Sequence, residues 1–119
     1  MEFVRVEVIT AATKLNGFKK AIARLGVTGL TVSQVMGCGV QKGTMEYEDE
    51  IHEDIELIPK QMIMMVMEKD KLKKVLDVIK KELYTGHIGD GKIFVYDVED
   101  VVKVRTGESG YDALQGADD

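Results

Sequence analysis

The chain has 119 residues and a net charge of −5, from 16 basic and 21 acidic side chains. This length fits one domain with a single core and excludes a second domain of ordinary size. A single cysteine, Cys38, excludes an internal disulfide and any metal site made of paired cysteines. The sequence shows no signal-peptide pattern and no apolar stretch of about 18 residues, so we expect a cytoplasmic domain without direct membrane insertion.

The negative charge is concentrated in one segment. Seven acidic residues and no Lys or Arg lie between Lys42 and Lys60, and the rest of the chain has 14 acidic against 16 basic residues. The seven are Glu46, Glu48, Asp49, Glu50, Glu53, Asp54 and Glu56. Such a segment repels phosphates, so it argues against nucleic acid as a partner.

The first half of the chain predicts a strand, a helix and a second strand. Residues 3–9 carry valines at every second position, which is typical of a strand. Asn16 can cap a helix whose apolar residues recur at helical spacing as far as Gly26. Residues 30–36 are rich in β-branched side chains and predict a second strand, which the segment GCGVQKG is expected to end.

The second half repeats this order. Pro59 precedes the apolar run 61–67, because proline is tolerated where a strand begins. Residues 70–83 carry apolar side chains at amphipathic helical spacing, with lysines on the opposite side. Residues 92–98 predict a fourth strand, and residues 101–106 predict a short C-terminal strand.

The predicted order β-α-β, long loop, β-α-β indicates an α+β fold of the ferredoxin-like kind, an antiparallel sheet with two helices on one face. The polar, acidic tail 109–119 is expected to be flexible. Residues 62–67 are apolar on both faces of their strand, and the helices cover only one face. We therefore expect a homo-oligomer; the alternative is that the loop or the tail covers the second face.

A glycine-rich stretch, TGHIGDGK, precedes the fourth strand. Gly86, Gly89 and Gly91 have a spacing and a context that differ from the dinucleotide-binding fingerprint. Successive glycines let backbone N–H groups converge on an anion, and Lys92 adds a positive charge at the exit of the loop. The stretch therefore indicates either a phosphate cradle, which His87 borders, or a plain connector with His87 in solvent.

Two further cations lie in the segment KVRTG. Lys103 and Arg105 are two residues apart, so on an extended segment they point to the same side. There they can clamp phosphate oxygens, or they can be solvated residues of a strand edge. Lys60, at one end of the acidic segment, is expected to approach Gln41 at the other end.

Three remaining residues favour ordinary roles. His52 has acidic neighbours that could hold a divalent metal, but a solvated charged loop is the favoured interpretation. Tyr47 is a conceivable modification site or an exposed loop residue. Cys38, between glycines, fits a small filler better than a nucleophile.

Several motifs together resemble the PII signal-transduction family. They are GVTGLTVSQVMGCGVQKG, the segment IPK, TGHIGDGKIFV and VVKVRTGE, and the resemblance runs from residue 4 to residue 108. It implies one domain over residues 1–108, a trimer, and nucleotides bound in clefts between subunits. Residues 39–59 then correspond to the T-loop of the family, which docks on target proteins.

The resemblance also implies roles for single residues. Lys103 and Arg105 would reach the phosphates from the neighbouring subunit, while Gln41 and Lys60 would engage 2-oxoglutarate and Mg-ATP, with Gln41 near the metal. At two positions where the family usually has arginine, this chain has Lys103 and Val40. Lys103 lacks the bidentate guanidinium fork of arginine. The expected ATP- or ADP-binding residues are Gly37, Gly39, Gln41, Lys60, Gly89, Asp90, Gly91, Lys92, Lys103 and Arg105.

The acidic segment departs furthest from the family pattern. Glu53 stands at the position of the uridylylated tyrosine, and Asp49 at that of the arginine that enters ammonium channels. Neither behaviour is therefore implied. The acidity instead predicts a target with a basic surface, either a membrane transporter or a metabolic enzyme. The expected docking residues are Glu46, Glu48, Asp49, Glu50 and Glu53.

These observations favour a non-enzymatic sensor in which ATP and ADP compete and bias the T-loop. One alternative is a slow ATPase or metal-assisted hydrolase, although the sequence offers no activated nucleophile or fixed metal triad. The other is a structural trimer that binds no ligand.

Overall fold

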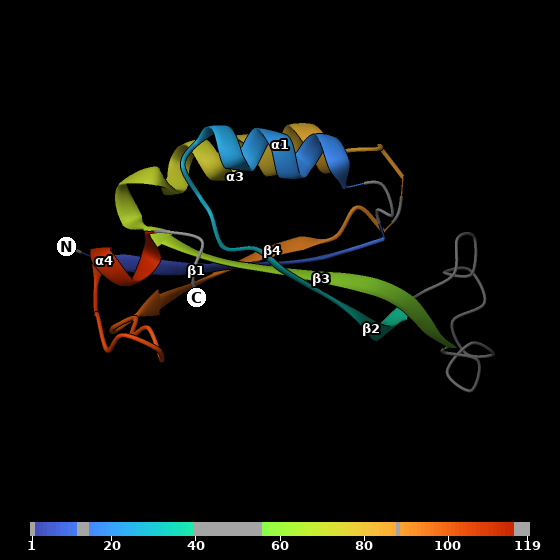
Figure 1. The fold of residues 1–119 in the computed structure, drawn as a ribbon. Helices are drawn as coiled ribbons and strands as arrows, with labels where there is room; N and C mark the ends of the chain where they lie inside the picture. The colour runs from blue at the N-terminus through green and yellow to red at the C-terminus, as the bar shows by residue number, and fades with distance from the viewer. Residues whose placement is uncertain (1, 12–14, 40–55, 88, 116–119) are drawn as a thin grey trace.

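The computed structural model describes residues 2–11, 15–39, 56–87 and 89–115. They form an α+β fold in which four antiparallel strands, in the order β2-β3-β1-β4, carry helices α1 and α3 on one face (Figure 1). The predicted fold class is confirmed. The elements are β1 (Phe3–Thr10), α1 (Asn16–Arg24), β2 (Thr31–Gly39), β3 (Glu56–Glu68), a 3₁₀ turn (Lys69–Lys71), α3 (Leu72–Leu83), β4 (Lys92–Val98) and α4 (Tyr111–Leu114).

The core lies between the sheet and the two long helices. Val6 and Val8 of β1 stand opposite Met65 and Ile63 of β3, and all four are at most 2% exposed. These four side chains pack against the apolar sides of α1 and α3, whose inward-facing residues are also buried. The buried helix residues are Phe18 and Ile22 of α1 and Val75, Ile79 and Leu83 of α3.

On the other face of the sheet, the described residues form no layer of long helices, but the C-terminal segment with α4 lies against one end, where Ala113 lines a cavity with Met64 and Val66 (Figure 1). Met64 and Val66 lie on this face, opposite Glu7 and Arg5 of β1, and Phe94 of β4 stands on the other side of Glu7. Phe94 is 42% exposed. The prediction that β3 is apolar on both faces is therefore confirmed. The alternative that the tail covers this face holds for one end of it, and covering by another subunit stays a prediction.

Strands β2 and β3 are longer than the sequence predicts. β2 continues to Gly39, so the glycines of GCG belong to a strand instead of ending it. β3 begins at Glu56, and Pro59 lies inside it. Proline is tolerated there because β1 pairs with β3 only from Gln61 onward, which leaves one side of Pro59 without a neighbouring strand.

The C-terminal segment is the main correction. Residues 101–106 do not form a strand, because the chain reverses and makes a single bridge between Val102 and Ser109. The tail is not flexible throughout, since Tyr111–Leu114 form α4 and Ala113 is buried. A second, smaller correction concerns Asn16, which is the first residue of α1 and makes no capping hydrogen bond from its side chain.

Within the described ranges, none of the helices is long and apolar enough to cross a bilayer.

We expect that ending the chain after Gly110 lowers the free energy of unfolding by about 1–3 kcal/mol, because two hydrogen bonds and a buried contact are lost. The bonds are those from the Thr28 hydroxyl to the Leu114 carbonyl (3.0 Å) and from the Lys103 ammonium to the Gln115 carbonyl (3.2 Å). The matched control ends after Gln115 and keeps both. Urea denaturation without nucleotide measures the difference, and equal stability of the two chains contradicts the docking of α4.

Candidate functional site

The glycine-rich loop passes against the end of β1. The Ala11 N–H donates to the Gly89 carbonyl at 3.0 Å. Gly91 has a φ of 96°, and a Cβ placed on it would lie 1.9 Å from the carbonyl oxygen of Ile9. No other residue fits at Gly91 without moving the backbone, so the glycine fixes where β4 and Lys92 begin.

Asp90 closes this loop on itself. Its carboxylate accepts hydrogen bonds from the backbone N–H groups of Thr85 (3.0 Å) and Gly86 (2.9 Å) and from the Thr85 hydroxyl. These bonds, led by that of the hydroxyl, lower the pKa of Asp90 below its ordinary value. One of the glycine N–H groups expected to face an anion, that of Gly86, is therefore bonded to Asp90 and is not available to the predicted phosphate cradle.

The β2–β3 ribbon ends on the same side of the sheet as this loop. Lys92 and Met62 are both opposite Ile9, so Lys60, two residues before Met62, shares their open face. The stem of Lys60 covers Gly37, where an added Cβ would lie 3.2 Å from the side chain. The structure thus brings together the loop, Lys92, Lys60 and Gly37, and Gly39 continues the same strand.

Lys103 and Arg105 lie at the other end of the sheet. The predicted extended segment is wrong, because the Gly107 N–H donates to the Lys103 carbonyl (2.8 Å) and closes a turn that contains Arg105. Lys103 therefore does not share one strand face with Arg105. Its ammonium group donates to the Gln115 carbonyl at 3.2 Å.

A cavity of about 310 Å³ lies beside Lys103. β2 begins only at Thr31, opposite Met64, so the end of β3 faces the connection from Gly26 to Leu30 instead of a strand. Met64 and Val66 line this cavity together with Ala113 of α4. Sequence reasoning missed these residues; the two glycines between α1 and β2 mark the connection but do not predict a cavity.

Some predicted residues lie outside the described ranges, so their positions stay predictions. They are Gln41, Glu46, Tyr47, Glu48, Asp49, Glu50, His52 and Glu53. Among the residues that the structure describes, no three His, Cys, Asp or Glu side chains form a group that could hold a metal.

Comparison with known proteins gives consistent matches. The family model described as "Nitrogen regulatory protein P-II" matches residues 3–108. The chain is 40% identical over 110 residues to a nitrogen regulatory protein P-II of Azospirillum brasilense, which covers 92% of this chain and 98% of that protein. It is also 40% identical to the nitrogen regulatory protein GlnK of Escherichia coli, over 92% of this chain and 97% of GlnK.

Two solved structures agree with these matches. The GlnK–ATP complex of B. subtilis has a TM-score of 0.77 and 36% identity, over 95% of this chain and 98% of GlnK. The Arabidopsis thaliana PII bound to citrate has a TM-score of 0.78 and 34% identity, over 98% of this chain and 94% of PII. The resemblance that the sequence motifs indicate is confirmed.

We expect Gly91→Ala to lower the free energy of unfolding by about 2–4 kcal/mol, because the new methyl group collides with the Ile9 carbonyl and strains the backbone. Gly29→Ala is the matched control: nothing lies within 4 Å of its added Cβ. That change should alter stability by no more than about 0.5 kcal/mol. Chemical denaturation of both variants tests this, and an unaffected Gly91→Ala protein contradicts the close approach.

We also expect the pKa of Asp90, followed by NMR of its carboxyl group, to lie below the ordinary value. The loop bonds favour the charged form, so their stabilisation is present above the ordinary pKa and is lost as the pH falls through the lowered pKa. Thr85→Val removes the hydroxyl and should raise the pKa of Asp90. Thr106→Val, whose hydroxyl instead accepts from the Glu108 N–H, should leave it unchanged; an equal shift in both variants contradicts the assignment.

Proposed function

Because this chain belongs to the nitrogen regulatory protein P-II family, we propose that it is a trimeric sensor that binds ATP or ADP in clefts shared by two copies. Membership in the family makes it a signalling protein and not an enzyme. The nucleotide, the trimer and the target are the parts that we propose. The relative from B. subtilis forms a complex with ATP, which supports the choice of ligand.

The proposal of a shared cleft rests on the distance between its two halves, which are the glycine loop with Lys92 and the segment with Lys103. The glycine loop follows the Thr10 end of β1, where Ala11 bonds to Gly89, and Lys103 lies at the Phe3 end, where Gly110 approaches the Phe3 ring. The eight residues of β1 span about 24 Å. One phosphate chain held by Lys92 therefore does not reach Lys103 of the same copy, and a neighbouring copy must supply that cation.

The open face of the sheet supports assembly. Phe94 and Tyr96 are 42% and 46% exposed there, and one strand, β1, separates them from the apolar side chains of β3 on the same face. Exposed apolar surface of this kind is typical of an interface between subunits. Closed rotational symmetry places the same face of each copy against the others, and three copies complete three equal clefts.

Within each cleft, the cations neutralise the phosphates and the glycine loop allows close approach. Lys60 and Lys92 come from one copy, and Lys103 and Arg105 come from its neighbour. Lys103 must exchange its bond with the Gln115 carbonyl for one with a phosphate, which carries a full negative charge and is the stronger acceptor. Gln41 would contact magnesium and, with Lys60, 2-oxoglutarate.

The acidic T-loop is the proposed output of the sensor. Its seven carboxylates suit a target with a basic surface, a transporter or a metabolic enzyme of the cytoplasm. ATP and ADP change target binding only if they bind the two loop conformations with different affinity. Lys60, one of the proposed nucleotide cations, packs against Gly37 in the β2–β3 ribbon. The ribbon leads into the T-loop, so this contact can link nucleotide binding to the conformation of the loop.

Lys92→Ala should weaken ATP binding by about 10- to 100-fold, because a charge-assisted contact is lost, and should leave the assembly intact. Isothermal calorimetry with ATP and with ADP measures the change. Lys73→Ala, which removes an exposed lysine of α3 on the helix side of the sheet, away from the face that carries Lys60 and Lys92, is the matched control. Equal affinity of both variants contradicts the cradle, and a wild-type protein that binds neither nucleotide favours the structural trimer.

Mixing variants tests whether the cleft is shared. Chains with Lys92→Ala and chains with Lys103→Ala should each bind ATP weakly when assembled alone. In a mixed trimer, one cleft receives Lys92 from one chain and Lys103 from the other, so tight binding returns at that cleft. If co-refolded mixtures contain mixed trimers by native mass spectrometry and still bind weakly, the two cations do not serve one nucleotide.

A further inference from the structure

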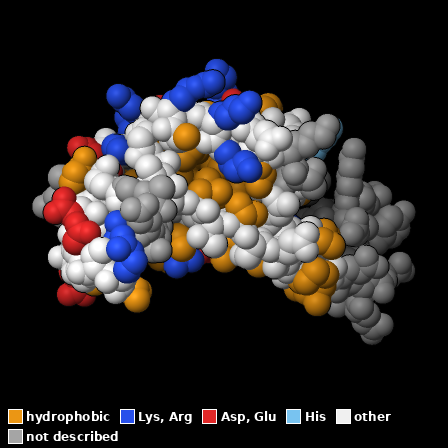
Figure 2. Space-filling model, viewed as in Figure 1, with side chains coloured by type: hydrophobic (Ala, Val, Ile, Leu, Met, Phe, Trp, Pro, Cys, Tyr) orange, Lys and Arg blue, Asp and Glu red, His pale blue; other side chains and the backbone are white. Residues whose placement is uncertain are grey.

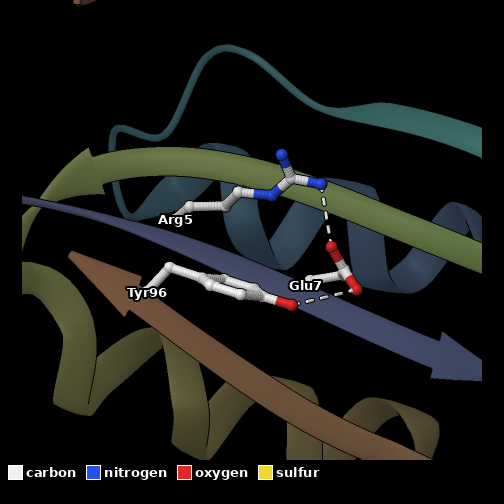
Figure 3. Close-up of polar contacts among 3 residues, drawn as sticks. All are labelled: Arg5, Glu7 and Tyr96. Carbon is white, nitrogen blue, oxygen red and sulfur yellow. Dashed lines mark hydrogen bonds and ion pairs between the residues drawn. The ribbon is translucent and has the colours of Figure 1, made fainter. Parts of the chain in front are cut away.

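The open face of the sheet carries one charged cluster among apolar side chains (Figure 3). The Arg5 guanidinium donates to a Glu7 carboxylate oxygen at 2.8 Å, and the Tyr96 hydroxyl lies 3.5 Å from the other oxygen. The guanidinium carbon also lies 5.6 Å from the centre of the Tyr96 ring. We call Arg5, Glu7 and Tyr96 the open-face cluster.

The surroundings of this cluster are apolar. Val66 stands opposite Arg5, and Met64 and Phe94 stand on the two sides of Glu7. The side chain of Glu7 is 14% exposed and that of Arg5 is 37% exposed. An ion pair in such a place is costly once the remaining water leaves, unless further hydrogen bonds satisfy both charges.

Within one copy, the hydrogen bonding of the cluster is incomplete. The Nε of Arg5 is buried and has no hydrogen-bond partner. A guanidinium group has five N–H donors, while a carboxylate has about four acceptor sites, so both groups have capacity left beyond the contacts of Figure 3. Whatever covers the open face must therefore offer an acceptor to Arg5 and a donor to Glu7.

A second copy of the chain meets both needs with the same residues. We propose that the guanidinium of Arg5 in one copy donates to the Glu7 carboxylate of the next copy, and that the open-face cluster thereby selects identical chains during assembly. This inference rests on the trimer of the proposed function. The apolar residues around the cluster supply most of the buried area, and the charges supply specificity.

The selection follows from what a wrong partner would do. A related chain with apolar side chains at positions 5 and 7 would bury Arg5 and Glu7 without giving them further hydrogen bonds. Removing one partner of a desolvated charge pair is strongly unfavourable, so such a mixed interface is weaker than the homotypic one. The cluster therefore acts against co-assembly with P-II chains of that kind.

The test is charge reversal followed by mixing. We expect Arg5→Glu and Glu7→Arg chains each to raise the dissociation constant of the trimer by at least about tenfold, because like charges meet across the interface. Sedimentation velocity measures this. Tyr96→Phe, which keeps the ring and removes only the longer of the two hydrogen bonds, is the matched control and should change the dissociation constant far less.

Mixing separates a contact between copies from one within a copy. Combined Arg5→Glu and Glu7→Arg chains should form mixed trimers by native mass spectrometry, at concentrations where each variant alone dissociates. If circular dichroism shows that either reversed chain is unfolded, the pair Arg5→Met and Glu7→Met is mixed in the same way. Mixed trimers support the proposal.

Two results contradict the proposal. The first is reversed chains that are folded and trimerise with wild-type affinity, and the second is mixtures without mixed trimers. Both leave the trimer of the proposed function intact. A wild-type protein that is monomeric under the same conditions instead contradicts that trimer and, with it, this inference.

Discussion

Strand β1 keeps the two cationic halves of the proposed site at opposite ends of the sheet. Because its eight residues pair along their whole length with β3 and along seven residues with β4, the glycine loop and Lys103 cannot approach each other within one copy. The same strand has a buried helix side and an open side that bears Arg5 and Glu7. The proposed assembly of identical chains brings the two ends of the sheet together and also covers its open side.

The basic side chains and the acidic segment lie in different parts of the chain. Lys and Arg side chains gather over the helices (Figure 2), where exposed lysines and an arginine belong to α1 and α3. The acidic segment between Lys42 and Lys60 connects β2 and β3 in the sequence. Exposed apolar residues, Met36 and Leu57, lie near the end of the β2–β3 ribbon that this segment connects and face the side of the helices. Met36 and Leu57 therefore lie on the opposite side of the sheet from the open face, which carries Lys60 and Lys92 of the proposed nucleotide cleft.

Periodicity and motifs in the sequence predict much of this molecule, because valines at every second position and the spacing in 70–83 reflect burial directly. The range of β4, 92–98, is correct, and so is the apolar second face of β3. The predicted C-terminal strand is wrong, because a local pattern of β-branched residues does not show that the chain reverses between Val102 and Ser109. The bonds of Asp90 and the cavity beside Met64 also escaped prediction, since each depends on residues that only the folded chain brings together. The glycine motif located the loop, but it could not show that Gly91 is required by the Ile9 carbonyl.

The proposed site holds one nucleotide between two copies, and a crystal structure of the assembled protein grown with saturating ATP is its sharpest test. We expect phosphates between the Gly89–Lys92 loop of one copy and Lys103 of its neighbour, with the Lys103 ammonium released from the Gln115 carbonyl. ATP bound wholly within one copy, or an empty cleft between copies, would contradict it.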